Sequence, residues 1–200
     1  MNVLIVYAHP NPGSFNAALR DLAVRTLSQA GHSILLSDLY TMRFNPVLSA
    51  QELQGDLKDI QPEIEKVRRA DLLLFQFPDW WYGMPAIMKG WIDRVFAYGF
   101  AYDDEHSFEN GLLRGKKAML SLTVGAREDY FRQAPQRDLM RVLEPIHYGI
   151  FAYCGLEVLP PFIAYGPGEM SEAERKATLE AFRKHLKRLP ELEPLRFSST

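Results

Sequence analysis

The sequence is poor in cysteine and has no long apolar run. Cys154 is the one cysteine among 200 residues, which excludes an intramolecular disulfide framework. No apolar stretch is long enough to cross a bilayer as a helix. Residues 3–8 form a short apolar run with no basic residue before it, so we expect no secretory signal. These absences predict a reduced, cytoplasmic protein in which Cys154 is a small buried hydrophobe and not a reactive thiol.

The chain also lacks an excess of charge of either sign. Lys and Arg number 23 and Asp and Glu number 25, which gives a formal net charge of −2. A general nucleic-acid binder needs a basic footprint, so we expect no nucleic-acid partner. Apolar residues make up 47% of the chain, a share typical of a folded globular protein and not of a disordered one.

Several signatures of catalysis and nucleotide binding are absent. The turn at residues 9–16 is not G-x-G-x-x-G, and residues 111–117 have the wrong glycine spacing for a phosphate-binding P-loop. The G-x-S-x-G sequence of serine hydrolases does not occur. No H-E-x-x-H or similar spacing occurs either, so we expect no metal site.

Strand-like and helix-like segments alternate along the chain. Continuous apolar runs, typical of strands buried on both faces, occupy residues 3–8, 33–39, 70–77 and 118–124, and a fifth strand begins at residues 156–159. Four helical patterns lie between or after these strands. One ends near Gly31, and another begins at Pro85. A long one spans residues 139–150 with a kink at Pro145, and the last begins at the capping box of Ser171 and Glu174 and ends at Pro190.

This alternation predicts an α/β fold with a doubly wound, five-stranded parallel sheet and helices on both faces. The flavodoxin-like strand order 2-1-3-4-5 is the expected topology. We expect one domain over residues 1–190 and a loosely attached tail over residues 191–200. Residues 40–61 and 103–116 exceed the usual loop length, and such long insertions are often functional.

Ligands of open α/β sheets bind beyond the carboxyl ends of the strands, where the strand order reverses. The first loop there, residues 9–16, places His9, Ser14 and Asn16 at the start of a helix, which predicts a phosphate site. A purely structural role remains open for these residues, because Ser14 or Asn16 could simply cap the helix.

The other two loops at this edge have unusual composition. The second carries Trp80, Trp81 and Tyr82, whose flat rings suit a planar ligand, although a hydrophobic lid or an oligomer contact would have the same composition. The third, residues 123–130, contains Gly125 and Ala126 where a ligand could approach the backbone closely. Taken by itself, this third loop is better explained as an ordinary strand-to-helix turn.

At these loops the sequence resembles the NAD(P)H:quinone oxidoreductase family, also called DT-diaphorases, which has a flavodoxin-like fold. The matching stretches are AHPNPGSFNAAL, SDLYTMRFNPVLSAQELQGDLKD, ADLLLFQFPDWWYGMPAIMKGWIDRVFAYGFAY, KKAMLSLTVGA and PIHYGIFAYCGLEVLPP. They cover most of residues 2–165 in the family's order. A related branch, the flavoprotein ancillary subunits of glutathione-gated potassium efflux systems, shares the AHP turn, the aromatic loop and CGL…LPPF.

The resemblance implies a flavin site, with FAD as the expected cofactor and FMN as the alternative, and NAD(P)H as electron donor. The cofactor-binding residues that it implies are His9, Ser14, Phe15, Asn16, Pro78, Asp79, Trp80, Trp81, Tyr82, Thr123, Val124, Gly125, Ala126 and Tyr130. It further implies that Tyr130 and the backbone at Gly125 serve catalysis at one edge of the flavin ring. Tyr102, from the partner subunit of a homodimer, and Trp81 would contact the substrate.

The sequence departs from the family pattern in three ways. Val124 and Ala126 stand where the quinone reductases usually have Thr and Gly, so one hydroxyl is lost while the backbone donors remain. Gln136 aligns with the family's relay histidine, and glutamine cannot carry a proton. Asp104 replaces a second aromatic residue after Tyr102, which should alter the preference for electron acceptors.

The predicted function is therefore a flavin-dependent NAD(P)H oxidoreductase that reduces quinones or similar planar acceptors by two electrons, with ping-pong kinetics. The alternative is a regulatory flavoprotein subunit that gates a potassium efflux system and binds a membrane transporter. A one-electron flavodoxin is a further rival, but such carriers are typically strongly acidic, and the net charge here is only −2.

Overall fold

The structure is a computed structural model that describes residues 1–197. Its strands are β1 (Asn2–Tyr7), β2 (Ser33–Asp38), β3 (Leu72–Pro78), β4 (Lys117–Val124) and β5 (Glu157–Tyr165). They form one sheet in the order β2-β1-β3-β4-β5, and every neighbouring pair is parallel. The predicted α/β fold with flavodoxin-like strand order is confirmed.

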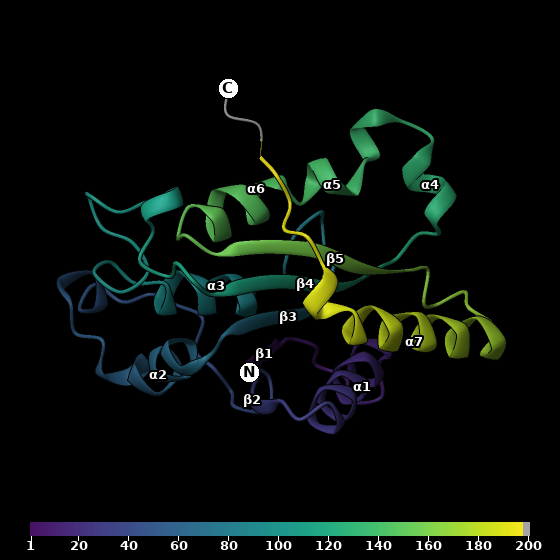
Figure 1. Ribbon diagram of the computed structural model, residues 1–200, viewed down its shortest axis with the longest axis horizontal. Coiled ribbons are helices and arrows are strands. Elements are labelled where there is room, and N and C mark those ends of the chain that lie inside the picture. The colour runs from purple at the N-terminus through teal and green to yellow at the C-terminus, as the bar shows by residue number, and fades with distance from the viewer. Residues whose placement is uncertain (198–200) are drawn as a thin grey trace.

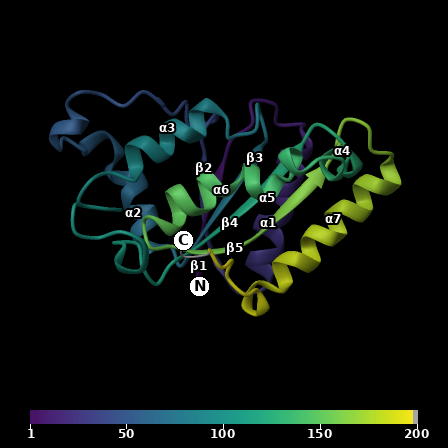
Figure 2. The same cartoon turned by 90° about the horizontal axis from the view of Figure 1, so that it is seen from above.

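The helices cover both faces of this sheet (Figures 1 and 2). Helices α1 (Phe15–Gln29) and α7 (Glu172–Lys187) lie side by side on one face and close an apolar core around Ile5, Leu74 and Phe182. Helices α2 (Gln61–Arg69) and α3 (Ala86–Val95) cover the other face. Strand β1 is apolar at almost every position because it lies between two strands and under both layers.

The ends of α1 and α7 follow from local sequence. The Ser14 hydroxyl accepts the Ala17 N–H at 3.1 Å at the start of α1, and Gly31 follows its end with a φ of +82°. At the start of α7, Ser171 and Glu174 form the predicted capping box, in which the Ser171 N–H donates to the Glu174 carboxylate at 2.7 Å. Both helix starts are therefore fixed by side chains next to the carboxyl edge of the sheet.

The helix predicted over residues 139–150, with a kink at Pro145, is present but divided into shorter pieces. The segment consists of α5 (Leu139–Val142), α6 (Glu144–Ile146) and a wide π-helical stretch, His147–Ala152. Pro145 has no N–H to continue α5, and its ring collides with the carbonyl of the preceding turn. Strand β5 continues beyond residues 156–159, which were predicted as its beginning. It can include Pro160 and Pro161 because prolines are tolerated in an edge strand, and the β4–β5 register shifts at these two residues.

The first insertion, residues 40–61, is ordered against α3. It contains two short 3-10 turns, Glu52–Gln54 and Lys58–Ile60, and leads directly into α2, a helix that the sequence analysis did not assign. Gly90 of α3 makes the close approach possible, since a Cβ atom there would lie 2.2 Å from the Pro46 carbonyl oxygen. Any larger residue at this position would push the insertion away from α3.

One arginine holds this insertion in place. Arg94, 3% exposed, donates to the Glu52 carboxylate at 2.7 Å and to the Asn45 carbonyl at 2.6 Å, and it also pairs with Asp59. Its guanidinium lies 5.2 Å from the centre of the Phe44 ring. We call this arrangement around Arg94 the insertion clasp.

The chain returns to the sheet near its carboxyl terminus. The Leu195 N–H donates to the Val158 carbonyl at 2.7 Å, and the Phe197 ring lies 5.4 Å from that of Tyr148. The predicted domain boundary at residue 190 stays a prediction, and residues 198–200 of the predicted tail lie outside the described residues. Across residues 1–197, no helix has the length and apolar character needed to cross a membrane.

Candidate functional site

The loops that follow β1, β3 and β4 meet at the carboxyl edge of the sheet around a cavity of about 380 Å³. The predicted site residues that line it are His9, Ser14, Phe15, Asn16, Pro78, Asp79, Trp80, Thr123, Val124 and Gly125. We call it the edge cavity. Residues from three separate stretches of sequence thus come together where the doubly wound topology places a ligand.

Asn16 joins three elements beneath the edge cavity. It is 3% exposed, its amide nitrogen donates to the Thr123 hydroxyl at 2.7 Å, and its amide oxygen accepts from Gln76 at 2.7 Å. These bonds use the Asn16 side chain to connect α1 with β3 and β4. The part of Asn16 still free to serve a ligand is its backbone N–H.

The first loop presents uncharged donors. The first turn of α1 leaves the N–H groups of Phe15 and Asn16 without an intrahelical partner, and no acidic residue in that turn offsets the positive end of the helix dipole. The His9 Nδ1 lies 3.0 Å from the Asn11 nitrogen and 3.2 Å from the Asn11 carbonyl oxygen, so the local contacts of the ring use this atom. The Nε2 of His9 is left for a ligand, while the Ser14 hydroxyl is already used as a cap.

The edge cavity also contains a cation that the sequence analysis missed. Arg175, in the first turn of α7, lines it together with Pro167 and Gly168. Its guanidinium donates to the Pro167 carbonyl and lies 5.6 Å from the centre of the Phe15 ring. The signal available in the sequence was the capping box at Ser171, which starts α7 at the same edge of the sheet.

The second loop turns its aromatic rings outward. Trp81 and Tyr82 adopt left-handed backbone angles, with φ of 55° and 56°, inside a tight turn closed by the Trp80 N–H donating to the Gly83 carbonyl at 2.9 Å. Trp81 is 99% exposed, and Trp80 and Tyr82 are nearly half exposed. Of these rings only Trp80 lines the edge cavity, and the other two extend beyond it.

Asp79 carries an unusual carboxyl at the base of this loop. Its backbone N–H donates to the Thr123 carbonyl at 2.7 Å, which fixes the loop to the end of β4. Its side-chain Oδ1 is buried and has no hydrogen-bond partner among residues 1–197. Burial raises the pKa of Asp79 to about 6, against a smaller lowering by the backbone of Gly83.

Tyr130 lies beside the second loop, outside the edge cavity. A hydrogen bond with the Tyr130 side chain is the main cause of the raised pKa of the neighbouring Tyr82 phenol. The guanidinium of Arg137 stacks on the Tyr130 ring at 4.1 Å from its centre, whereas Gln136, aligned with the family's relay histidine, is exposed. Arg137 is thus a second cation that the sequence analysis missed. Ala126, like Tyr130, does not line the edge cavity.

Tyr102 lies at the opposite edge of the sheet. Helix α3 leads the chain from the carboxyl end of β3 back to the start of β4, and Tyr102 is in this return segment. Its ring is 5.8 Å from that of Tyr98 and 5.9 Å from that of Tyr153, while Asp104 accepts from the Tyr98 hydroxyl at 2.9 Å. Within one protomer Tyr102 does not reach the edge cavity, so its role as a partner-subunit contact stays a prediction.

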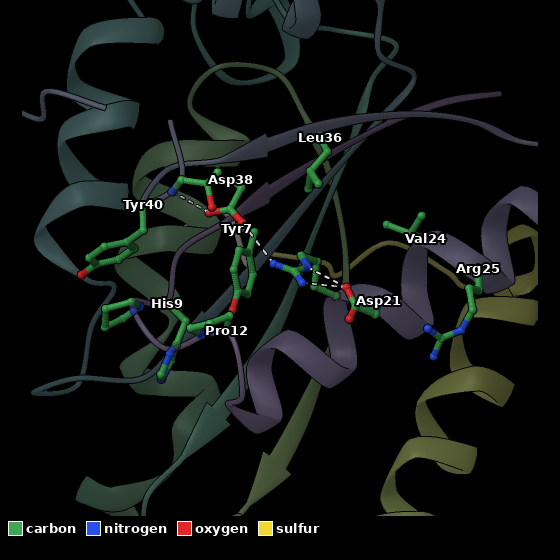
Figure 3. Close-up of a pocket in the computed structure, with 12 residues that line it drawn as sticks. Tyr7, His9, Pro12, Asp21, Val24, Arg25, Leu36, Asp38 and Tyr40 are labelled. Carbon is green, nitrogen blue, oxygen red and sulfur yellow. Dashed lines mark hydrogen bonds and ion pairs between the residues drawn. The ribbon is translucent and has the colours of Figure 1, made fainter. Parts of the chain in front are cut away.

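A second cavity, of about 760 Å³, lies between α1 and the end of β2 and shares His9 with the first (Figure 3). Arg20 lines it, paired with Asp21 at 2.7 Å and Asp38 at 3.1 Å, and stacked over Tyr7 at 4.5 Å. Arg25 lines the same cavity from the exposed side of α1.

The chemistry of metals and thiols has little support among residues 1–197. No group of three or more His, Cys, Asp or Glu side chains there is placed to hold a metal ion. Cys154 is buried, and burial raises the pKa of its thiol to about 12, which confirms that it is a small buried hydrophobe. His147 is also buried, which lowers its pKa to about 4 and keeps it neutral.

Comparisons with known proteins identify the family of this fold. Residues 1–186 match a protein family whose description is "flavodoxin-like fold". The chain is 39% identical to ribosyldihydronicotinamide dehydrogenase (quinone) of Homo sapiens, over 96% of this chain and 94% of that protein. It is 37% identical to NAD(P)H dehydrogenase (quinone) 1 of Cavia porcellus, over 98% of this chain and 79% of that protein.

A solved structure gives the same result. A Klebsiella pneumoniae protein assigned as a quinone reductase superposes with a TM-score of 0.91 at 37% identity, over 99% of this chain and 88% of that one. The likeness thus extends over nearly the whole chain in both sequence and structure. The chain belongs to the flavodoxin-like NAD(P)H:quinone oxidoreductase family.

Proposed function

We propose that this protein is a flavin-dependent NAD(P)H oxidoreductase that reduces quinones or similar planar acceptors by two electrons. The observation that carries the proposal is the edge cavity, where the donors at the start of α1 and the aromatic loop after β3 meet. When bound there, a flavin would accept a hydride from NAD(P)H and pass two electrons to the acceptor. Donor and acceptor would use the same exposed ring face in turn, which predicts ping-pong kinetics.

The residues of the first loop would hold the phosphate end of the flavin. The free N–H groups of Phe15 and Asn16 are uncharged donors at the positive end of a helix, and His9 lines the same cavity beside them. Arg175 adds one positive charge on the α7 side. Phosphate would therefore be bound without a glycine-rich loop, which agrees with the absence of G-x-G-x-x-G in the sequence.

The other two loops would orient the planar ring. Trp80 provides an aromatic wall, and the small residue Gly125 lets the backbone approach the ring edge. Tyr130 would donate a hydrogen bond where negative charge develops, and Arg137 on its ring keeps a positive charge nearby. This charge would stabilise the same negative charge, but arginine stays protonated and, like Gln136, would not relay a proton.

We propose FAD as the cofactor. The edge cavity continues past the phosphate loop to Pro167, Gly168 and Arg175, which leaves a surface and a cation for a second phosphate and a nucleoside. The first insertion contributes only Tyr40 and Thr41 to the second cavity, whose Arg20 is already paired with Asp21 and Asp38.

We further propose a homodimer in which each site is completed by the partner subunit. Trp81 and Leu53 are strongly exposed, at 99% and 76%, and would be covered in such a dimer. Tyr102 lies too far along its own sheet to reach its own edge cavity. Sedimentation of the purified protein should give a dimer whose mass does not change on adding flavin.

The decisive experiment starts from the purified chain. Bound flavin should be visible by its absorbance, and heat release followed by chromatography should identify it as FAD. Adding NADPH without oxygen should bleach the flavin, and adding menadione should restore its colour. A protein that binds neither FAD nor FMN after reconstitution would refute the proposed function, and bleaching without restoration by any quinone would refute the acceptor class.

A further inference from the structure

One polar atom of the edge cavity has no role in the proposed function so far. The Asp79 Oδ1 is buried, and residues 1–197 supply no hydrogen-bond partner for it. Two other polar side chains there are occupied: Asn16 with Thr123 and Gln76, and Ser14 with the start of α1. A buried polar atom without a partner is destabilising unless a ligand or a proton satisfies it.

The position of Asp79 is fixed by the backbone. Its N–H is bonded to the Thr123 carbonyl at 2.7 Å, and the turn that follows is closed by Trp80 and Gly83. These bonds fix the backbone from which the carboxyl extends. Asp79 lines the edge cavity, where the planar ring of the ligand would lie.

The charged and titratable groups around Asp79 leave it unpaired. His9 and Arg175 line the same cavity, from the loop after β1 and from α7, and Tyr82 interacts with the Asp79 charge from its own loop. Tyr130 and Arg137 interact with each other beyond Tyr82, and the Arg127 guanidinium is paired with Glu174 at 2.6 Å. No ion pair or side-chain hydrogen bond within residues 1–197 reaches the Asp79 carboxyl. Its charge is therefore free to act on a ligand.

We propose that Asp79 is a positioning residue whose protonation state sets the reduction potential of the flavin bound in the edge cavity. This inference rests on the proposed function. Reduction by a hydride adds negative charge to the site, and an ionised carboxyl at its wall opposes that charge. A protonated Asp79 does not oppose it and can donate a hydrogen bond to the ring edge. The reduced flavin bound to this protein is thus a weaker reductant in acid, and a stronger one in alkali, than free reduced flavin.

The test is the midpoint potential of the bound flavin, measured by dye equilibration at pH 5 and pH 8 in the wild type and in Asp79→Asn. Asparagine keeps the size of the side chain and removes its charge. At pH 8 we expect the variant to favour reduced flavin by at least tenfold, which is about 30 mV for a two-electron couple. At pH 5 the two proteins should agree within about threefold, because the wild-type carboxyl is then mostly protonated, with a pKa of about 6.

The matched control is Asp129→Asn, which removes the same charge from an exposed residue of α4 (Glu128–Arg132), outside the edge cavity. Its potential should follow the wild type at both pH values. Equal potentials of Asp79→Asn and the wild type at pH 8, or an equal shift in the Asp129→Asn control, would overturn the inference.

The wild type alone provides a second measurement if Asp79→Asn loses its flavin. Between pH 5 and pH 8 its potential should fall more steeply than that of free flavin in the same buffers, and a parallel fall would overturn the inference. Failure of the proposed function gives a different result. A wild type that binds no flavin has no flavin potential to measure, and both the proposed function and the role of Asp79 are then refuted. A wild type that binds and turns over flavin without this pH effect refutes the role of Asp79 only.

Discussion

The insertion clasp and the edge cavity both bring polar groups from distant parts of the sequence together, but they satisfy them differently. Around Arg94 every strong donor has an acceptor within the chain: Glu52, Asp59 and the Asn45 carbonyl. Around the edge cavity, Asp79 has a buried oxygen without a partner, and Trp81 is almost fully exposed. Complete pairing indicates a structural element, whereas incomplete pairing indicates a place for a ligand or a second subunit.

The clasp should show the largest effect on stability. Arg94→Leu leaves the buried Glu52 carboxylate without its cation, and removal of one partner of a buried ion pair costs about 3–5 kcal/mol of unfolding free energy. Urea unfolding of the flavin-free protein measures this loss. Arg183→Ala, which breaks the exposed pair with Glu180, is the control and should change stability by less than about 1 kcal/mol. Similar losses in both variants would show that the clasp is not a structural element of this kind.

A smaller effect is expected beneath the edge cavity. Asn16→Ala removes two buried hydrogen bonds and should lower the unfolding free energy of the flavin-free protein by about 1–3 kcal/mol. Asn11→Ala, whose exposed side chain accepts only the Gly13 N–H, is the control. Unchanged stability of Asn16→Ala together with lost flavin binding would instead make Asn16 a direct ligand of the cofactor.

On the ligand side, Arg175→Ala should weaken the binding of FAD by about tenfold, or 1.4 kcal/mol. The loss should be smaller for FMN if the guanidinium contacts the second phosphate, and equal for both if it contacts the phosphate that they share. Fluorescence titration with each flavin distinguishes these results. Arg183→Ala lies on the same helix, outside the edge cavity, and should leave both affinities unchanged, so an unchanged Arg175→Ala would remove this residue from the site.

The smallest effect concerns the pH dependence of stability without flavin. The native pKa of Asp79 is raised from 3.8 to about 6, so the folded protein holds this proton more tightly than the unfolded chain does. The resulting stabilisation is complete below pH 3.8 and is lost as the pH rises to about 6. Because the side chain is partly exposed, we expect a loss on the order of 1 kcal/mol. From pH 4 to pH 7 the melting temperature of the wild type should fall relative to that of Asp79→Asn. A constant difference between the two proteins over this pH range would contradict the prediction.

Much of the sheet could be predicted because its signals are local. The apolar runs of β1, β3 and β4 reflect burial on both faces, and the alternation with helices left few topologies. The sequence pattern also identified the three loops that meet at the edge cavity. The helix ends at Ser14 and Ser171 were readable because capping uses side chains within the same turn.

Other features depended on contacts between distant residues. Helix α2 was missed because its buried Glu63 looks like a surface residue until it meets the Ser37 hydroxyl at 2.6 Å and the Trp91 indole N–H at 2.8 Å. Arg175 and Arg137 were missed for a similar reason, since neither belongs to a motif and both become relevant only through the rings of Phe15 and Tyr130. The free oxygen of Asp79 is a property of the folded loop and has no sequence signature.

The left-handed backbone at Trp81 and Tyr82 has a consequence for protein engineering. Two consecutive side-chain-bearing residues with φ near 55° are strained by about 1–3 kcal/mol each, a cost that glycine avoids. A library selected for heat resistance alone should therefore accumulate glycine or asparagine at these two codons. Such variants would have a higher melting temperature but would lack the outward-facing indole. A screen that does not also measure turnover would therefore select against the aromatic side chains of this loop.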